Sequence, residues 1–313
     1  MNTVLILGAN GRIGAATAQA FDAAGWRVVS QVRRASSVPG AVTIPLDDTD
    51  ALVRAAAGAS AVVYAVSPLY TDWSRVAAMF EQGLEVTRRL GARLLLPGSV
   101  YNHGAGMPAV IDEHTPMRPT TDKGRIRVAM EQQLRDSGVN GVVLRAGDFF
   151  GAGTGTWVDQ LIAKDIAAGK LTYPGPLDVV HAWAYLPDLA RAFVALASRP
   201  LPAGVLDVPF EGHGVTGREF MAALEQAAAE LGLKPQQGFR SGFWSWPLVR
   251  AAGLFNPMLR ELGRMSYLWR VPHRLGGERL RALAGPLPAT PLVAALRESL
   301  LALGVARPAL GYR

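Results

Sequence analysis

The stretch Val4-Leu5-Ile6-Leu7-Gly8-Ala9-Asn10-Gly11-Arg12-Ile13-Gly14 joins an aliphatic run to a glycine-rich turn and the start of an alanine-rich segment. A strand, a turn of this kind and a helix make the first unit of a dinucleotide-binding fold. Gly8 lets the chain turn off the strand, Gly11 lets the backbone approach a pyrophosphate, and Gly14 lets the helix pack on the sheet. The N–H groups that begin the helix then face the diphosphate. Dinucleotide contacts are therefore expected at Gly8, Asn10, Gly11, Arg12, Ile13 and Gly14.

The composition indicates a folded chain with a sizeable core. Half of the 313 residues are hydrophobic and 18% are charged, which excludes a disordered protein. Cysteine is absent, so disulfides, thiol nucleophiles and cysteine-ligated metals are excluded. Apolar runs stay below the ~18 residues that a membrane-spanning helix needs, and we expect a cytoplasmic protein.

The chain carries a net charge of +7. Such an excess attracts anionic partners such as nucleic acid or a phosphorylated cofactor, but scattered surface arginines give the same total. Because the basic residues form no long cluster, we favour scattered arginines and expect no nucleic acid as a partner. A membrane is not an expected partner either. A small-molecule substrate is the expected partner, and a homodimer is a candidate assembly.

Short β-branched runs alternate with Ala- and Leu-rich stretches across the first half of the chain. This alternation is typical of the doubly wound α/β (Rossmann) architecture, a parallel sheet with helices on both faces. Strands are expected at Val4–Leu7, Arg27–Val32, Ala41–Ile44, Ala61–Ala65, Arg93–Leu96 and Gly141–Arg145. Helices are expected at Arg12–Ala24, Asp50–Ala57, Trp73–Leu90 and Asp122–Asp136. Glycine, which commonly caps helix C-termini, follows these helices at Gly25, Gly58, Gly91 and Gly138.

After Gly151 the alternation becomes irregular. Gly/Thr-rich and Pro/Gly-rich stretches at Gly151–Thr156 and Tyr173–Pro176 interrupt it, with helices expected between and after them. The sequence contains no internal repeat and no low-complexity linker. It predicts a dinucleotide-binding domain at residues 1–150 and a smaller, partly helical substrate lobe at residues 151–313 that is interleaved with the sheet.

Several short motifs follow one another along the chain. After the glycine turn come Leu96-Pro97-Gly98-Ser99-Val100-Tyr101, Asp112-Glu113-His114-Thr115-Pro116, Leu144-Arg145-Ala146-Gly147-Asp148-Phe149-Phe150-Gly151, Ala184-Tyr185-Leu186-Pro187-Asp188-Leu189-Ala190 and a helix start at Thr216–Phe220. In order and spacing the chain resembles the extended and atypical short-chain dehydrogenase/reductases, the NAD(P)-dependent epimerase/dehydratase superfamily. This resemblance implies a Rossmann fold, a nicotinamide cofactor and oxidoreductase chemistry.

In that family a serine near the end of the fifth strand and a Tyr-x-x-x-Lys pair on the next helix carry the acid–base chemistry. Ser99 matches the serine. Lys123 stands where the tyrosine belongs, and Arg127 stands where the lysine belongs. This departure places the chain with the atypical members of the superfamily.

The spacing of four residues puts Lys123 and Arg127 on one helical face. If that face lines the cleft, Arg127 can hold the ribose, because its charge is permanent. Desolvation and a neighbouring cation both lower the pKa of an ammonium group, which makes Lys123 a candidate proton donor near neutral pH. The alternative is that both residues are solvated surface cations.

Tyr101 is the other candidate acid. It follows Ser99 by two residues, so both side chains face the same way on an extended segment; packing is the alternative role for the tyrosine. His103, His114 and His181 are further candidate proton donors. None of them has the spacing of a metal site, and we expect no bound metal.

The residues after the second expected strand favour NADP over NAD. A fold that binds NAD places an acid there for the ribose hydroxyls, but Gln31-Val32-Arg33-Arg34 contains none. Arg33 and Arg34 can pair with a 2′-phosphate through charge-assisted bonds, and Arg12 can approach the same phosphate. We therefore expect NADP(H) as the cofactor, with NAD as the weaker alternative. The remaining expected cofactor contacts are Asp47, Ala65 and Val66.

Residues 239–270 hold aromatic side chains among arginines, at Phe239, Phe243, Trp244, Trp246, Phe255, Tyr267 and Trp269. Three interpretations are open: a membrane-surface amphipathic helix, a lid or substrate wall, and ordinary core or subunit contact. Pro247, Gly253 and Pro257 break the stretch into short helices and argue against a long interfacial helix. Other aromatic residues that can line the cleft are Trp73, Trp157, Tyr173 and Trp183.

Together these features predict an NADPH-dependent reductase of a small carbonyl-type substrate, apolar or aromatic because of the aromatic lining. Lys123 or Tyr101 supplies the proton, and Ser99 holds the substrate oxygen. A dinucleotide-binding sensor without turnover is the alternative, favoured by the missing Tyr-x-x-x-Lys pair. A nucleotide-sugar epimerase or dehydratase is the third hypothesis.

Overall fold

The computed structural model describes residues 1–67 and 74–305. Within these ranges seven parallel strands form the central sheet. Their spatial order is β11 (Val205–Pro209), β7 (Gly141–Ala146), β5 (Arg93–Ser99), β4 (Ala59–Tyr64), β1 (Thr3–Leu7), β2 (Arg27–Val32) and β3 (Ala41–Thr43). The order reverses between β1 and β4, which confirms the doubly wound fold. Ligands bind such sheets at the carboxyl ends of the strands at this switch point.

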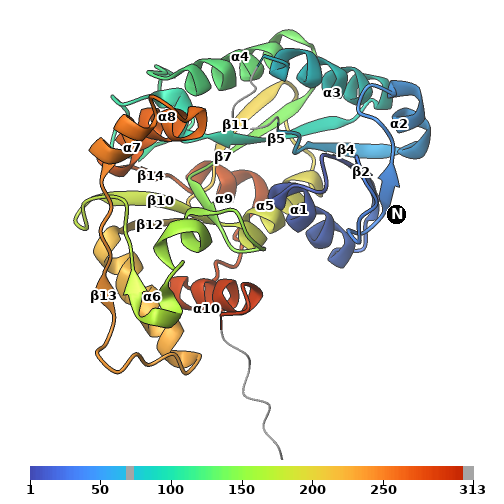
Figure 1. Ribbon diagram of the computed structural model, residues 1–313. Coiled ribbons are helices and arrows are strands. Elements are labelled where there is room, and N and C mark those ends of the chain that lie inside the picture. Colours follow the sequence, from blue (N-terminus) through green and yellow to red (C-terminus); the bar gives the residue numbers. More distant parts are fainter. Residues whose placement is uncertain (68–73, 306–313) are drawn as a thin grey trace, which may run out of the picture.

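Helices cover both faces of the sheet (Figure 1). One face packs against α2 (Thr49–Ala55), α3 (Val76–Leu90) and α4 (Asp122–Asp136). The other face packs against α1 (Arg12–Ala23), α5 (Leu186–Ala197) and α9 (Glu278–Ala284). The central strands β1, β4, β5 and β7 are almost entirely buried between these layers, as is typical of the near-continuous aliphatic runs of parallel strands.

The expected elements of the first half are present, with shifts at their ends. β5 continues to Ser99, beyond the expected end at Leu96. Pro97 lacks an N–H, but β4 pairs with β5 only as far as Leu95, so the proline lies beyond the ladder on that side. The helix expected from Trp73 begins at Val76 in the structure, and Trp73 lies outside the described residues.

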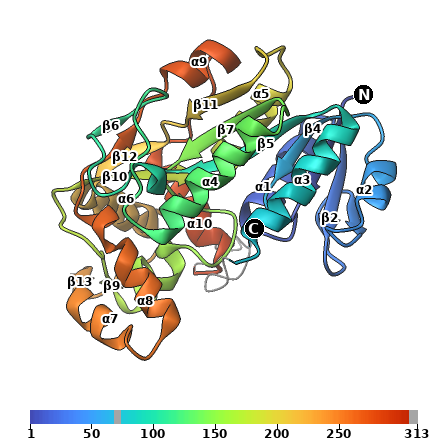
Figure 2. The same ribbon diagram turned by 90° about the horizontal axis from the view of Figure 1, so that it is seen from above.

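The second half adds β11 to the main sheet and builds a lobe beside it (Figure 2). Its three-stranded sheet consists of β8 (Asp148–Phe150), β10 (Val180–Tyr185) and β12 (His213–Thr216). Its larger helices are α6 (Gly217–Glu230) and α10 (Leu292–Ala302), with α7 (Trp246–Ala252) and α8 (Pro257–Arg264) further out. The domain boundary at residue 150 stays a prediction.

Short elements complete the described chain. The short helices are η1 (Val100–His103), η2 (Val158–Ile162), η3 (Ile166–Ala168) and η4 (Met265–Trp269). The short strands pair as β6 (Val110–Ile111) with β14 (Arg274–Leu275), and β9 (Lys170–Leu171) with β13 (Arg240–Ser241). No helix in residues 1–67 or 74–305 has both the length and the apolar character needed to cross a membrane.

Candidate active site

The glycine turn joins β1 to α1 at the switch point. Gly8 has a φ of +80°, and a Cβ there would lie 2.9 Å from backbone atoms of Ala65 and Val66. At Gly14 a Cβ would lie 2.5 Å from the Gly8 carbonyl oxygen. The close packing of the chain itself therefore requires glycine at both positions, and the turn brings Ala65 and Val66 next to the expected diphosphate site.

Gly11 differs from the other two glycines because it is exposed. The nearest atom to a Cβ added at Gly11 would be the Gly8 carbonyl oxygen, at 3.3 Å. Gly11 is also the N-cap of α1, and no side chain of the described residues caps this helix. The first N–H groups of α1 therefore remain available to an anion. Because Gly11 has no side chain, the turn leaves room for the diphosphate of a dinucleotide.

Gln31 fixes the turn from the side of β2. Its Oε1 accepts a hydrogen bond from the Gly8 N–H at 3.0 Å, and its Nε2 donates to the carbonyl that follows β3 at 2.7 Å. The Asn10 Nδ2 donates to the Arg34 carbonyl oxygen at 3.3 Å. The end of β2 therefore lies against the turn, and the side chains of Arg33 and Arg34 are exposed there.

The other expected cofactor contacts lie around this turn. A Cβ at Gly155 would lie 3.3 Å from the Arg12 Nη1 atom, so the Arg12 side chain extends toward the loop that follows β8. Convergence of Arg12, Arg33 and Arg34 on one phosphate stays a prediction. Asp47 is exposed in the turn before α2, and its contact with adenine also stays a prediction.

Ser99 is held at the end of β5 by a buried polar network. Its Oγ donates to the Asn102 Oδ1 at 3.3 Å, and its carbonyl accepts from the Arg145 Nη1 at 2.8 Å. The Asn102 Nδ2 donates to the Glu131 Oε1 at 2.7 Å. Arg145 is fully buried and pairs with Glu131 at 2.9 Å and with Asp207. The network fixes the serine where β5 and β7 end.

Lys123 lies in the first turn of α4 and is 2% exposed, so it is not a solvated surface cation. Burial lowers the pKa of Lys123 to about 7, and the Glu261 carboxylate of α8 opposes this effect. We also expected the neighbouring cation Arg127 to lower the pKa of Lys123. That expectation was wrong, because Arg127 is not among the groups that shift this pKa. Desolvation alone accounts for the lowering.

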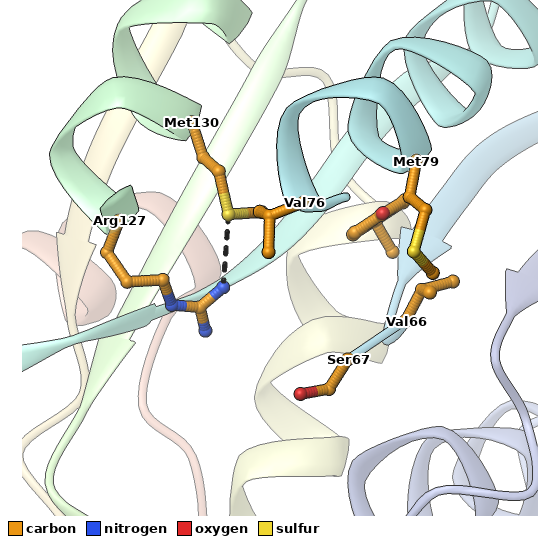
Figure 3. A pocket seen from close by; sticks show the side chains of 7 residues that line it. Val66, Ser67, Val76, Met79, Arg127 and Met130 are labelled. Carbon is orange, nitrogen blue, oxygen red and sulfur yellow. Dashed lines mark hydrogen bonds between the residues drawn. The ribbon is translucent and has the colours of Figure 1, made fainter. Parts of the chain in front are cut away.

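Arg127 lies one turn further along α4 and is half-buried. Its Nη2 donates to the Pro97 carbonyl at 3.2 Å, and its Nη1 donates to the Met130 Sδ at 3.7 Å. Figure 3 shows the guanidinium beside a small cavity that Val66 and Ser67 line from the end of β4. The cavity measures about 10 Å³, which is room for about one water molecule. It is too small for a substrate, but it places Arg127 beside an expected cofactor contact.

The segment from α8 to η4 covers this end of the sheet. Tyr101 of η1 is half-buried and packs with η4 in one apolar cluster, and its carbonyl oxygen contacts α4. Arg264 at the end of α8 pairs with Asp122 at the start of α4 at 3.2 Å. Tyr101, two residues after Ser99, therefore lies against η4, and Lys123 lies near Glu261 of α8. This arrangement fits the interpretation of this segment as a lid or wall.

A carboxylate–imidazole pair that no sequence pattern indicated lies just beyond the end of β7. Asp148 begins β8 immediately beyond the end of β7, and the His181 Nε2 lies 2.9 Å from its Oδ2. The His181 Nδ1 lies 3.3 Å from the Leu268 carbonyl oxygen. Both ring nitrogens therefore face oxygen atoms of the protein, which fixes the orientation of the imidazole. The ring also stacks on Trp269 at 4.3 Å.

The other two candidate histidines differ in their surroundings. The His114 side chain is 87% exposed and takes no part in the site. His103 is buried in η1, and burial together with the Arg145 charge lowers its pKa. Among the residues that the structure describes, no three His, Cys, Asp or Glu side chains are placed to hold a metal.

Aromatic rings form the wall of the second lobe next to this pair. Trp183 stacks on Phe220 at 4.3 Å, and Trp157 and Tyr173 meet Trp269 edge-on at 5.0 and 5.4 Å. The rings continue to His181, which lies 5.0 Å from Trp183. Trp183, Phe220 and Trp269 are buried, so these rings form the core of the second lobe next to the carboxylate–imidazole pair.

Comparison with known families agrees with this geometry. The sequence model of the NAD dependent epimerase/dehydratase family matches residues 4–205. The match begins in β1 and reaches the first residue of β11. It therefore contains the glycine turn, Ser99, the start of α4 and the Asp148–His181 pair.

Individual relatives add detail. The 3-diazoavenalumate denitrifying reductase of a Streptomyces species is 30% identical over 215 residues, which cover 61% of this chain and 71% of that protein. L-threonine dehydrogenase from Phytophthora infestans has a TM-score of 0.73 at 18% identity. The Bordetella bronchiseptica enzyme WbmH in complex with NAD+ has a TM-score of 0.71 at 18% identity. Both structural alignments cover 97% of this chain and 99% of the other, and at these identities they show a shared fold.

Proposed function

Because this chain belongs to the NAD-dependent epimerase/dehydratase family, we propose that it is an NADPH-dependent reductase of small aromatic or otherwise apolar carbonyl compounds. Family membership makes it an NAD(P)-dependent enzyme of the oxidoreductase type. The cofactor preference, the direction of the reaction and the class of substrate are the proposal.

The observation that carries this proposal is Lys123, which is buried at the start of α4 and has a pKa of about 7. A bound nicotinamide supplies the hydride that reduces the carbonyl carbon. The Ser99 hydroxyl exchanges its 3.3 Å hydrogen bond to the Asn102 Oδ1 for one to the substrate oxygen, and the Lys123 ammonium gives that oxygen a proton as negative charge develops. The proton transfer leaves a neutral amine, the form that burial favours. Arg127 holds the ribose hydroxyls with its permanent charge.

The wall of the second lobe supports an aromatic substrate. Tyr173, Trp183 and Trp269 form a packed aromatic cluster. Trp183 and Trp269 are buried in it, whereas Tyr173 is half-buried, so an aromatic compound would contact the cluster at its edge, at Tyr173. The Asp148–His181 pair is the polar group on that side, and it can orient a polar ring substituent. The Streptomyces relative, which is named as a reductase, supports reduction over epimerisation.

The end of β2 supports NADPH as the cofactor. Arg33 and Arg34 are exposed next to the glycine turn, and the strand end offers no carboxylate for ribose hydroxyls. Fluorescence titration of the protein with NADPH and NADH tests the preference, with Arg33→Ala as the variant. We expect tighter binding of NADPH by the wild type, and a loss of about tenfold or more of that preference in the variant, the usual contribution of a charge-assisted bond. Tighter binding of NADH by the wild type would overturn this part of the proposal.

Turnover is tested by following NADPH oxidation with benzaldehyde, cinnamaldehyde and an aliphatic aldehyde of similar size. We expect oxidation with the aromatic aldehydes and a lower kcat/KM for the aliphatic one. Protein that binds NADPH but oxidises it with none of these compounds would favour the sensor hypothesis. Conversion of a nucleotide sugar without net consumption of the cofactor would favour the epimerase hypothesis.

A further inference from the structure

The exposed apolar side chains of this protein are concentrated on one hairpin, which we define as residues 243–258, from Phe243 through α7 to the first turn of α8. Among the described residues eight large hydrophobic side chains are exposed, and five of these lie in the hairpin: Phe243, Leu248, Leu254, Phe255 and Met258. Leu254 and Phe255 form the turn between the helices and are 76% and 92% exposed. Scattered exposed hydrophobic residues are ordinary, but a group of this kind marks an interaction surface.

The hairpin and its flanks are also strongly basic. Exposed arginines lie at Arg240, Arg250, Arg260, Arg264 and Arg270. Glu261 is the one acidic residue between positions 240 and 270. Its side chain is 16% exposed and pairs with Arg264 at 2.7 Å, so it offers little negative charge to a partner. Arg264 pairs with Glu261 and Asp122, but no ion pair is found within the described residues for the other four arginines. An apolar turn flanked by such arginines is complementary to an apolar phase with an anionic surface.

We propose that this hairpin docks on an anionic membrane surface, with Leu254 and Phe255 inserted at the level of the headgroups and the arginines paired with lipid phosphates. A second copy of the chain fits the hairpin less well, because symmetrical docking would bring the arginines of two copies together. This proposal revises the sequence-based expectation that no membrane is a partner. That expectation rested on the breaks at Pro247, Gly253 and Pro257, which exclude a long interfacial helix but not a docking turn between two short helices.

The position of the hairpin permits such docking. Both views place α7 and α8 at an edge of the molecule (Figures 1 and 2). The inner side of α8 reaches the candidate active site, since Glu261 influences Lys123 and Arg264 pairs with Asp122. Docking would therefore bring the segment that covers the site to the lipid surface, where apolar aromatic compounds collect.

Co-sedimentation of the full chain with vesicles tests the proposal without using enzymatic activity. One set of vesicles contains phosphatidylcholine alone, and the other contains phosphatidylcholine and phosphatidylglycerol in equal parts. We expect tighter binding to the mixed vesicles. Raising the ionic strength from about 0.1 M to about 1 M shortens the Debye length from about 10 Å to about 3 Å and should release the protein. Arg260→Gln should weaken binding about fivefold, the usual effect of one basic residue near an anionic surface.

The double substitution Leu254→Ser with Phe255→Ser tests the apolar part. Both side chains are exposed, so we expect an unchanged thermal unfolding midpoint and at least tenfold weaker binding to the mixed vesicles. Val110→Ser is the matched control, because Val110 is 42% exposed on β6; its binding should equal that of the wild type.

Three outcomes overturn the proposal. The first is no binding of the wild type to the mixed vesicles. The second is binding that the double variant and Arg260→Gln leave intact. The third is self-association of the wild type, measured by light scattering without lipid, that the double variant abolishes while lipid binding is absent; the hairpin would then be a contact between copies of the chain.

Discussion

Replacement of Lys123 by methionine tests the proposed proton donor directly. Methionine is unbranched and apolar and fills a similar buried volume, so the start of α4 stays packed while the proton is lost. A general acid contributes typically ~10²–10⁴ in rate, and we expect kcat for aldehyde reduction to fall within that range. The Kd for NADPH, measured by fluorescence titration, should stay nearly unchanged. The rate of turnover is measured from the loss of NADPH absorbance.

The pH profile carries a signature that a structural role would not produce. The ammonium form of Lys123 donates the proton, so the wild-type rate should fall as the pH rises through the lysine pKa of about 7. Glu261→Gln removes the carboxylate that favours the ammonium form, which should lower the pKa of Lys123 and move this limb of the profile to lower pH. Steady-state rates measured across the neutral range give both profiles.

The same burial predicts how stability depends on pH. The drop in the pKa of Lys123 from 10.5 to about 7 corresponds, at about 1.4 kcal/mol per unit, to at most roughly 5 kcal/mol against the charged amine. The unfolded chain keeps this proton up to pH 10.5, whereas the folded protein releases it above about pH 7. Wild-type stability should therefore rise with pH between these values. Lys123→Met should lack this rise. Its gain in free energy of unfolding over the wild type, measured by urea denaturation, should be largest below pH 7.

Tyr101→Phe is the matched control, because it removes a hydroxyl and keeps the ring that packs with η4. We expect it to retain most of the turnover. The reasoning is refuted if Lys123→Met keeps its turnover while Tyr101→Phe abolishes it. The difference in stability between Lys123→Met and the wild type should change across pH 7. If it is the same below and above pH 7, the lowered pKa of Lys123 is refuted.

The glycine turn and the buried network give further expectations. Gly14→Ala would bring a Cβ to 2.5 Å from a backbone oxygen, so we expect a lower thermal unfolding midpoint together with lost NADPH binding; a normal midpoint would contradict the packing role. Gly11→Ala meets only a 3.3 Å contact and should mainly weaken NADPH binding, which titration would reveal; equal affinity would argue against a diphosphate at this turn. Glu131→Gln leaves Arg145 short of one buried partner and should cost about 3–5 kcal/mol in chemical denaturation; a change below about 1 kcal/mol would show that Asp207 compensates.

The fold could be predicted because its determinants are local. Each strand, glycine turn and helix of the first half is specified by neighbouring residues, and Gly91 in the left-handed conformation ends α3 where the sequence placed it. The end of β5 was missed for a tertiary reason. Pro97 usually ends a strand, and only the early separation of β4 from β5 lets the strand continue to Ser99.

The candidate site was predicted less completely because its chemistry depends on contacts between distant segments. The burial of Lys123 and the influence of Glu261 on it depend on segments far apart in the chain, since Arg264 and Glu261 of α8 lie near the start of α4; no local pattern encodes this. Asp148 and His181 are 33 residues apart in the chain. His181 was a candidate proton donor by residue type, but its carboxylate partner appears only when β8 and β10 lie side by side.

The family resemblance predicts a tyrosine at the position of Lys123, and a lysine there would have a physical rationale. Desolvation always favours the neutral form of a group, so it shifts the pKa values of phenols and amines in opposite directions. Within this protein burial, followed by the charge of Asp148, raises the pKa of Tyr267 to about 12, whereas burial lowers the pKa of Lys123 to about 7. A tyrosine beneath α8 and η4 would need a cation close enough to overcome that burial before it could exchange protons at neutral pH. A lysine reaches the useful range through burial alone, which fits an acid that works at a position as buried as that of Lys123.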